Sequence, residues 1–415
     1  MTEMIFASQN GRNIPTEDKI FGISNRAKAM AAKEGKDKVI NATIGALLDD
    51  EGKLIVLSSV DEVFRSLSPL DYAEYSPIGG TPGFKEAVKK DVFRSFKPDC
   101  FTEVIATPGG TGAIRNTIAN YSSRGDAVLT TDWYWAPYNT IVQEQERRLE
   151  TFEIFDSEGN FNKESFKNSI DEILKAQDRL VIILNTPSHN PTGYALTNDD
   201  WEAVTSILES VSKEKKITLL VDAAYVDFAG EEEESRSFLP YLEKIDDNAF
   251  VIIAHSLSKA YTLYGLRCGA MVCMTKSKEK AEEFKRVCEF SSRASWSNCT
   301  KAPQVILEKI YNDPALLKKV MDERKQYRDM LIKRGRIFKE EAEKIGLKTL
   351  PFRSGFFMSI PCDNPEAAAA LLEKEGIFTV PLAKGLRLAG SSVTEKDCIR
   401  LPEAVKRAIE STQNN

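Results

Sequence analysis

The 415-residue sequence has few of the residues that common metal and relay sites require. It contains two histidines, His189 and His255, and none of its seven cysteines stands in a Cys-x-x-Cys pair. A histidine-based metal site or a serine–histidine relay is therefore hard to build, and we expect no bound metal. An odd, unpatterned set of cysteines favours reduced thiols and a cytoplasmic location over a disulfide framework.

Long apolar runs and a strong positive charge are also missing. No stretch approaches eighteen uninterrupted apolar residues, and the first residues show no basic region followed by an apolar one. The sequence thus predicts neither a membrane span nor a signal peptide. The net charge of −6 argues against nucleic acid as the main partner.

What the sequence does contain, from about residue 100 onward, is an alternation of short apolar runs with helical stretches such as 198–215. The runs are rich in β-branched residues and lie at 103–107, 126–132, 179–185, 217–222, 250–256 and 269–274. Such runs are typical of strands buried on both faces of a mainly parallel sheet. A doubly wound α/β fold follows.

A long helical pattern begins at Asp313-Pro314 and ends at Gly346, which fits the residue preferences at helix ends. Strand-like pieces then alternate with a helix and indicate a smaller α+β domain; the strands are expected at 355–360, 377–381 and 386–390, and the helix at 364–376. We therefore predict an N-terminal arm with part of the small domain (1–50), a large domain (51–313), and an interdomain helix with the small C-terminal domain (314–415).

Lys259 is the residue that most directly indicates chemistry. It lies in the segment HSLSKAYTLYGLRCGAM (255–271), which directly follows the strand-like run VIIA (251–254). Ser256 stands before it in this segment and Arg267 after it. A lysine amine forms a Schiff base with an aldehyde, and a hydroxyl and a guanidinium can hold a phosphate. The segment therefore predicts pyridoxal phosphate as the cofactor.

Other candidates stand at the ends of neighbouring strands, where ligands bind in open α/β sheets. Gly110 and Thr111 open a helix whose N-terminus favours a phosphate, although the glycines also suit a plain strand–turn–helix elbow. Asp222 can pair with the pyridine nitrogen of the cofactor or, alternatively, cap a helix.

Three further side chains suit the cofactor ring. Tyr225 and Asn190 can each donate a hydrogen bond to its phenolic oxygen, although the Asn-Pro-Thr-Gly segment is also a common turn. Trp133 can stack on the ring. Three aromatic residues stand in a row here, so Tyr134 and Trp135 remain open as the stacking residue.

Taken together and in order, these motifs resemble the class I aminotransferases of pyridoxal-phosphate fold type I, most closely the aspartate and aromatic aminotransferase subgroup. The motifs are INATIGALLDDEGK (40–53), YSPIGG (75–80), GGTGAIR (109–115), HNPTG (189–193), DAAY (222–225), SLSK (256–259) and SRASWSN (292–298). The resemblance covers most of the chain. It implies an α/β fold with a seven-stranded, mainly parallel sheet between helices in the large domain, and a smaller α+β domain.

The resemblance also implies roles for the residues around the cofactor. Lys259 is the Schiff-base lysine and the proton shuttle, assisted by Asp222 and Tyr225. The phosphate is held by Gly110, Thr111, Ser256 and Arg267, and the ring contacts are Trp133, Asn190, Asp222 and Tyr225. Tyr75 reaches the phosphate of a neighbouring subunit, so the resemblance implies a homodimer with shared active sites.

Substrate binding is implied at Gly45, Asn190, Arg293 and Arg387. Arg293, which we expect in a loop, crosses the dimer interface to a side-chain carboxylate in the aspartate subgroup. Arg387 is the candidate for the α-carboxylate, but it stands two residues before Ala389, whereas the subgroup places this arginine four residues before the alanine. That slot is Gly385 here, and two residues along a strand shift a side chain by roughly 6–7 Å.

The sequence therefore predicts a ping-pong aminotransferase that acts on an acidic amino acid, which the resemblance implies is aspartate, and a 2-oxo acid such as 2-oxoglutarate. An aromatic or broad-range aminotransferase and a pyridoxal-phosphate-dependent β-lyase stay open as alternatives. The sensor half of a transcriptional regulator is a remote one, since the family motifs begin near residue 40 and leave no room for a DNA-binding domain before them.

Overall fold

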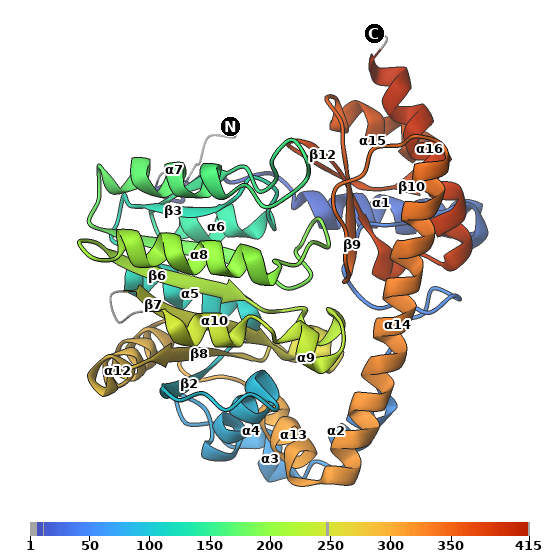
Figure 1. Cartoon of the computed structure of the whole chain (residues 1–415). Helices are drawn as coiled ribbons and strands as arrows, with labels where there is room; N and C mark the ends of the chain where they lie inside the picture. The colour runs from blue at the N-terminus through green and yellow to red at the C-terminus, as the bar shows by residue number, and fades with distance from the viewer. Residues whose placement is uncertain (1–5, 11, 246–248, 414–415) are drawn as a thin grey trace.

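A seven-stranded sheet forms the centre of the larger part of the molecule (Figure 1). The computed structural model describes residues 6–10, 12–245 and 249–413. The sheet has the order β2-β8-β7-β6-β5-β3-β4. Its strands are β2 (Phe101–Thr107), β3 (Ala127–Thr131), β4 (Arg148–Phe152), β5 (Arg179–Asn185), β6 (Lys216–Asp222), β7 (Ala249–Ser256) and β8 (Gly269–Thr275). β8 pairs antiparallel with β2 and β7, while the other pairs are parallel, which confirms the predicted fold class.

Helices cover both faces of this sheet, and the alternation of side chains along β5 shows why. Leu180 and Ile182 join one apolar cluster, and Val181 and Ile183 join another on the opposite face. The first cluster includes side chains from α7 (Lys163–Leu174), α8 (Asn198–Val211) and α10 (Leu239–Lys244). The second includes side chains from α5 (Gly109–Tyr121), α6 (Pro137–Glu144) and α12 (Lys278–Ser295).

The edge strand β4 was missed by the sequence analysis. Four of its five residues are exposed or partly exposed, and only Phe152 is buried. An edge strand pairs on one side only and does not need the continuous apolar run of a central strand. The pattern that revealed the other six strands is therefore absent from Arg148–Phe152.

The helix α14 (Pro314–Lys344) joins the two parts of the molecule (Figure 1), and it begins where the capping pattern predicted. Asp313 caps it by accepting hydrogen bonds from the backbone of Ala315 and Leu316. Along its length, Val320 packs in the large core and Phe338 in the small one. In the described part of the chain no helix, including this one, combines the length and apolarity that crossing a membrane requires.

The smaller part contains two short sheets and three helices. β9 (Phe357–Pro361), β12 (Gly385–Ala389) and β11 (Val380–Leu382) form an antiparallel sheet, and β1 (Ile40–Asn41) pairs in parallel with β10 (Ile377–Phe378). The helices are α1 (Lys19–Glu34), α15 (Pro365–Lys374) and α16 (Glu395–Gln413). The strands and helix expected after residue 354 are thus present, while the domain boundaries at residues 50 and 313 stay a prediction.

Candidate active site at the carboxyl edge of the sheet

Lys259 lies in α11 (Leu257–Ala260), the short helix that follows β7 directly. Its Nζ donates a hydrogen bond to the carbonyl oxygen of Gly45 at 2.6 Å. Burial, followed by the positive charges of Arg267 and Arg387, lowers the pKa of Lys259 to about 7. A neutral amine is the nucleophilic form of lysine, so this environment prepares Lys259 to react with an aldehyde near neutral pH.

Asp222 ends β6 and is buried. Tyr138 in α6 donates its hydroxyl to Asp222 Oδ2 at 2.5 Å. Burial raises the pKa of Asp222, while the Tyr138 hydrogen bond, the Ala224 N–H and the charge of Lys259 oppose that rise. Sequence reasoning missed Tyr138, because no local pattern links it to a residue so distant in the chain. The one available signal was an aromatic stretch that ends in Ala-Pro-Tyr directly after β3.

Asn190 and Tyr225, the two predicted contacts of the cofactor's phenolic oxygen, face each other. Asn190 Nδ2 lies 3.5 Å from the Tyr225 hydroxyl, and the Asn190 backbone N–H donates to Asn185 Oδ1 at 2.6 Å. Both side chains are buried. Asn190 Oδ1 has no hydrogen-bond partner, although a buried amide oxygen normally has one. This oxygen is therefore available to a bound molecule.

Arg267 is held against the start of α5. Its Nη1 donates to Ser258 Oγ at 3.1 Å and to the Tyr264 carbonyl oxygen at 2.9 Å. A Cβ atom on Gly109 would lie 2.5 Å from Arg267 Nη2, so only glycine allows this close approach. The guanidinium thus meets the backbone at the N-terminal turn of a helix, where an anion is favoured.

Gly110 and Thr111 stand in that first turn of α5. Gly110 is buried, and a Cβ atom there would lie 3.6 Å from Cβ of Ser256 at the end of β7. Thr111 is exposed. The predicted phosphate residues Gly110, Ser256 and Arg267 are therefore close together, with Thr111 on the open side of the turn.

Trp133 lies in a different environment from the one expected for a ring-stacking residue. It is 5% exposed, packs in the large core, and its Cη2 atom lies 2.8 Å from the position that a Cβ atom on Gly385 would take. Trp135 instead contacts Tyr138 edge to face, with ring centroids 5.5 Å apart. Because Tyr138 binds Asp222, this contact places Trp135 next to the Tyr138–Asp222 pair.

Arg387 is buried in β12. Its Nη2 donates to the Thr43 carbonyl oxygen at 2.6 Å, and its guanidinium lies 4.6 Å from the centre of the Phe357 ring. Its Nε has no hydrogen-bond partner. The predicted substrate residue Gly45 is packed against the same ring, because a Cβ atom on it would lie 2.4 Å from Phe357 Cζ.

The backbone explains why the arginine stands at 387 and not at 385. A Cβ atom on Gly385 would lie 2.1 Å from the Ile360 carbonyl oxygen in the neighbouring strand and 2.8 Å from the Trp133 ring. No side chain fits there without a shift of the backbone. Arg387 lies two residues on, so it keeps the same face of the strand.

Tyr75 and Arg293 are not brought to Lys259 within the chain. Tyr75 is 86% exposed. Arg293 is exposed as well, and its Nη1 contacts Ser297 Oγ at 2.7 Å. The expectation of a loop at Arg293 is wrong, because this residue lies in the last turn of α12.

The family described as "Aminotransferase class I and II" matches residues 37–405. The chain belongs to this family. Its membership confirms the predicted resemblance and identifies the chain as an aminotransferase. The predictions of fold class and enzyme class are therefore both correct.

Three relatives illustrate the range of this similarity. The aminotransferase is 39% identical to an aminotransferase from Anaerococcus prevotii, with a TM-score of 0.95 and coverage of 98% of this chain and 100% of that one. It is 26% identical over 338 residues to the mitochondrial aspartate aminotransferase of Arabidopsis thaliana, which covers 80% of this chain and 75% of the relative. It also shares the fold, at 19% identity and a TM-score of 0.80, with an aromatic-amino-acid aminotransferase from Burkholderia pseudomallei covalently bound to pyridoxal phosphate, over 97% and 100% of the two chains.

The residues of this aminotransferase fit pyridoxal phosphate, the predicted cofactor. Lys259 offers an amine of lowered pKa, Asp222 a buried carboxylate and Arg267 a guanidinium beside a helix N-terminus. Asn190 Oδ1 and Arg387 Nε are buried polar atoms without partners in the same region. A bound cofactor and substrate would satisfy them.

Proposed function

We propose that this aminotransferase moves the amino group of an acidic amino acid, with aspartate as the first candidate, to a 2-oxo acid such as 2-oxoglutarate. Arg387 supports an amino-acid substrate, because its buried guanidinium has an unpartnered Nε that can bind an α-carboxylate. The preference for an acidic side chain rests on Arg293, whose guanidinium is exposed in the single chain. A forked cation of this kind suits a carboxylate. The charge of Arg387 also reaches Lys259, whose pKa it helps to lower.

The roles of the side chains follow from their positions. Bound pyridoxal phosphate supplies an aldehyde and an electron-accepting ring. Lys259 would hold the cofactor through its aldehyde, and its amine, once released by the incoming substrate, would move the proton at the substrate Cα. Asp222, held by Tyr138, keeps the ring nitrogen protonated. Because one amino acid leaves as a 2-oxo acid before the second substrate enters, the kinetics are ping-pong.

Trp135 is our revised candidate for the ring contact. The sequence left Trp133, Tyr134 and Trp135 open, and Trp135 packs against the tyrosine that binds Asp222. Trp133 contacts the small domain at Gly385 instead.

We further propose a homodimer in which Tyr75 and Arg293 serve the active site of the partner subunit. Exposed apolar side chains beside Tyr75 support an interface there, since Leu70 is 73% and Tyr72 61% exposed. Arg293 would bind the side-chain carboxylate of the substrate. This arrangement makes two chains necessary for selecting an acidic substrate.

We also propose a cytoplasmic location and small-molecule substrates. The proposed domain boundaries lie at residues 50 and 313. All seven cysteines are free thiols, which supports a reducing compartment. The acidic net charge of −6 supports the absence of a nucleic-acid partner.

An aromatic amino acid is the second candidate substrate. Phe357 and Tyr225 pack edge to face beside Lys259, with ring centroids 5.8 Å apart, and offer an apolar wall to an aromatic side chain. An enzyme can keep the dicarboxylate arginine and still accept such substrates.

Single amino acids mixed with the protein loaded with pyridoxal phosphate will decide between these candidates. We expect oxaloacetate from aspartate as the main 2-oxo product, measured by mass spectrometry. A larger rate with phenylalanine than with aspartate would replace the acidic assignment by the aromatic one.

Arg293→Val tests the specificity role directly. Loss of one partner of a buried charge pair commonly costs about 2–5 kcal/mol, so kcat/KM for aspartate should fall about 30-fold or more while the value for phenylalanine is unchanged. Arg286→Val removes another exposed arginine of the same helix and should leave both values unchanged. Equal losses on both substrates in Arg293→Val would remove Arg293 from substrate selection.

A further inference from the structure

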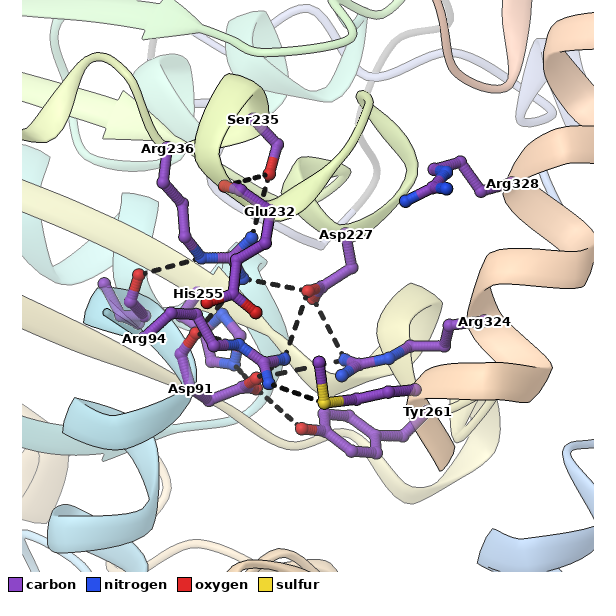
Figure 2. Close-up of polar contacts among 12 residues, drawn as sticks. Asp91, Arg94, Asp227, Glu232, Ser235, Arg236, His255, Tyr261, Arg324 and Arg328 are labelled. Carbon is purple, nitrogen blue, oxygen red and sulfur yellow. Dashed lines mark hydrogen bonds and ion pairs between the residues drawn. The ribbon is translucent and has the colours of Figure 1, made fainter. Parts of the chain in front are cut away.

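A second group of charged side chains is buried where α4 (Pro82–Phe93), the helix α14 and the loop after β6 meet. It consists of Asp91, Arg94, Asp227, Arg236 and Arg324, which we call the ion cluster (Figure 2). None of these side chains is more than 6% exposed. The ion cluster shares no side chain with the residues assigned to the cofactor or the substrate.

The ion cluster is held by short contacts between opposite charges. Arg94 lies 2.7 Å from Asp91, and Arg236 and Arg324 lie 2.9 and 3.3 Å from Asp227. Burial alone would raise the pKa of Asp91, but Arg94 and the other cationic neighbours hold it well below its ordinary value. The two carboxylates therefore stay charged.

The charges do not balance. Three guanidinium groups face two carboxylates, so 3 − 2 leaves one positive charge in excess among the five buried side chains. An uncompensated buried charge is costly, and proteins normally pair it. The excess predicts a missing negative partner.

A small cavity beside the ion cluster is the place where that partner would sit. The cavity is lined by the cationic side chains of Arg94, Arg236, Arg324, Arg328 and Lys325 and by the carboxylates of Asp227 and Glu232. The Nη1 atom of Arg324 is buried and makes no hydrogen bond, although it lies 3.3 Å from Asp227 Oδ2. Figure 2 shows the guanidinium groups of Arg94, Arg236 and Arg324 gathered around Asp227.

We propose that this cavity binds a small free oxyanion such as sulfate or inorganic phosphate. Guanidinium groups present planar forks of N–H donors that match the oxygens of such an ion. The ion neutralises the excess charge and joins α14 to the large domain. The proposal does not depend on the substrate of the aminotransferase.

Glu232 is the internal competitor for this site. Its side chain lines the cavity, and it makes no ion pair among the described residues. It is partly exposed, so it can leave the cavity to an incoming ion. Glu232→Gln should therefore strengthen oxyanion binding.

Thermal unfolding of the protein loaded with pyridoxal phosphate tests the proposal, because the cofactor then fills the phosphate site at Arg267. Sodium sulfate is titrated at constant ionic strength against sodium chloride. We expect a saturable rise in Tm of about 2–4 °C in the unmutated protein. Arg328→Met should lose this rise, while Arg336→Met, which removes an exposed arginine of the same helix, should keep it.

An equal sulfate response in Arg328→Met and Arg336→Met would overturn the proposal. So would a response seen in Glu232→Gln but not in the unmutated protein, because Glu232 would then be the partner of the excess charge. Crystals of the unmutated holoenzyme grown with selenate give a direct reading that needs no variant. An anomalous peak within hydrogen-bond distance of Arg324 and Arg236 is expected, and its absence at saturating selenate contradicts the site.

Discussion

Lys259 and the ion cluster are both buried, but their charged neighbours have opposite effects on ionisation. The cations Arg267 and Arg387 act on Lys259 in the same direction as burial, so its pKa falls to about 7. In the ion cluster carboxylates alternate with guanidinium groups, and the pKa of Asp91 stays well below its ordinary value despite burial. Burial therefore does not decide whether a side chain keeps its charge, because the sign of its neighbours does.

The two regions therefore have different roles, since the surroundings of Lys259 serve the reaction and the ion cluster stabilises the fold. A lysine whose pKa lies near neutral pH can both bind an aldehyde and carry a proton, which a carboxylate or guanidinium held in its charged form cannot do. The charges of the ion cluster are fixed by their partners and instead connect segments from Asp91 to Arg324. Substitutions in the two regions should therefore change different measurements.

Lys259→Ala should have the largest effect, and it should affect activity alone. Transamination should fall about 10³-fold or more, because the nucleophile and the proton carrier are lost together. The visible absorption band of the lysine-bound cofactor should also disappear, while the urea midpoint of the apoprotein does not fall. A persistent band would contradict the central role of Lys259.

Asp91→Asn should have the opposite profile and reduce stability. Removing one partner of a buried ion pair leaves arginines uncompensated and commonly costs about 3–5 kcal/mol. Urea unfolding of the holoenzyme measures the loss. Asp61→Asn, which breaks the exposed pair with Arg65, should cost less than about 1 kcal/mol. Similar losses in the two variants would show that the ion cluster does not support the fold.

The pH dependence of apoprotein stability tests the low pKa of Lys259. The unfolded chain binds this proton below a pKa of 10.5 and the folded chain only below about 7. Between these values the unfolded state binds more protons, so the wild type gains up to about 1.4 kcal/mol of stability per pH unit as pH rises. Relative to Lys259→Met, it should therefore be least stable below pH 7 and recover toward pH 10. A pH-independent difference in urea unfolding would show that Lys259 is not deprotonated by its surroundings.

Tyr138→Phe should have the smallest of these effects. It removes the hydroxyl that opposes the rise in the Asp222 pKa, and a hydrogen bond to a charged group is worth about 1.5–3 kcal/mol. We expect the affinity for pyridoxal phosphate, measured by tryptophan fluorescence, to fall about 10-fold at neutral pH. Tyr134→Phe in the same stretch should change it little. Equal affinities in the two variants would remove Tyr138 from the support of Asp222.

Local patterns in the sequence predicted much of this molecule. The apolar runs marked six of the seven strands of the large sheet, and Asp313 with Pro314 marked the start of α14. Lys259, Asp222 and Asn190 were found because each stands at or just after a strand end. These features depend on short stretches of chain, so the sequence alone can predict them.

The features that were missed depend on contacts between distant segments. Tyr138 reaches Asp222 across the fold. The sequence showed the offset of Arg387 but not its cause, which is the carbonyl oxygen of a neighbouring strand. The ion cluster draws on residues from Asp91 to Arg324 that form no motif. Pairings of this kind exist only in three dimensions.

The closed position at Gly385 makes the placement of Arg387, the arginine proposed for the α-carboxylate, depend on several residues. An arginine introduced at 385 would collide with the Trp133 ring and with the Ile360 carbonyl oxygen. A single substitution at 385 or at 387 therefore cannot move the arginine to the position that it has in the aspartate subgroup. Transfer of substrate preference between these enzymes would therefore require exchanging residue 133 and two strands together, because moving the arginine alone is not sufficient.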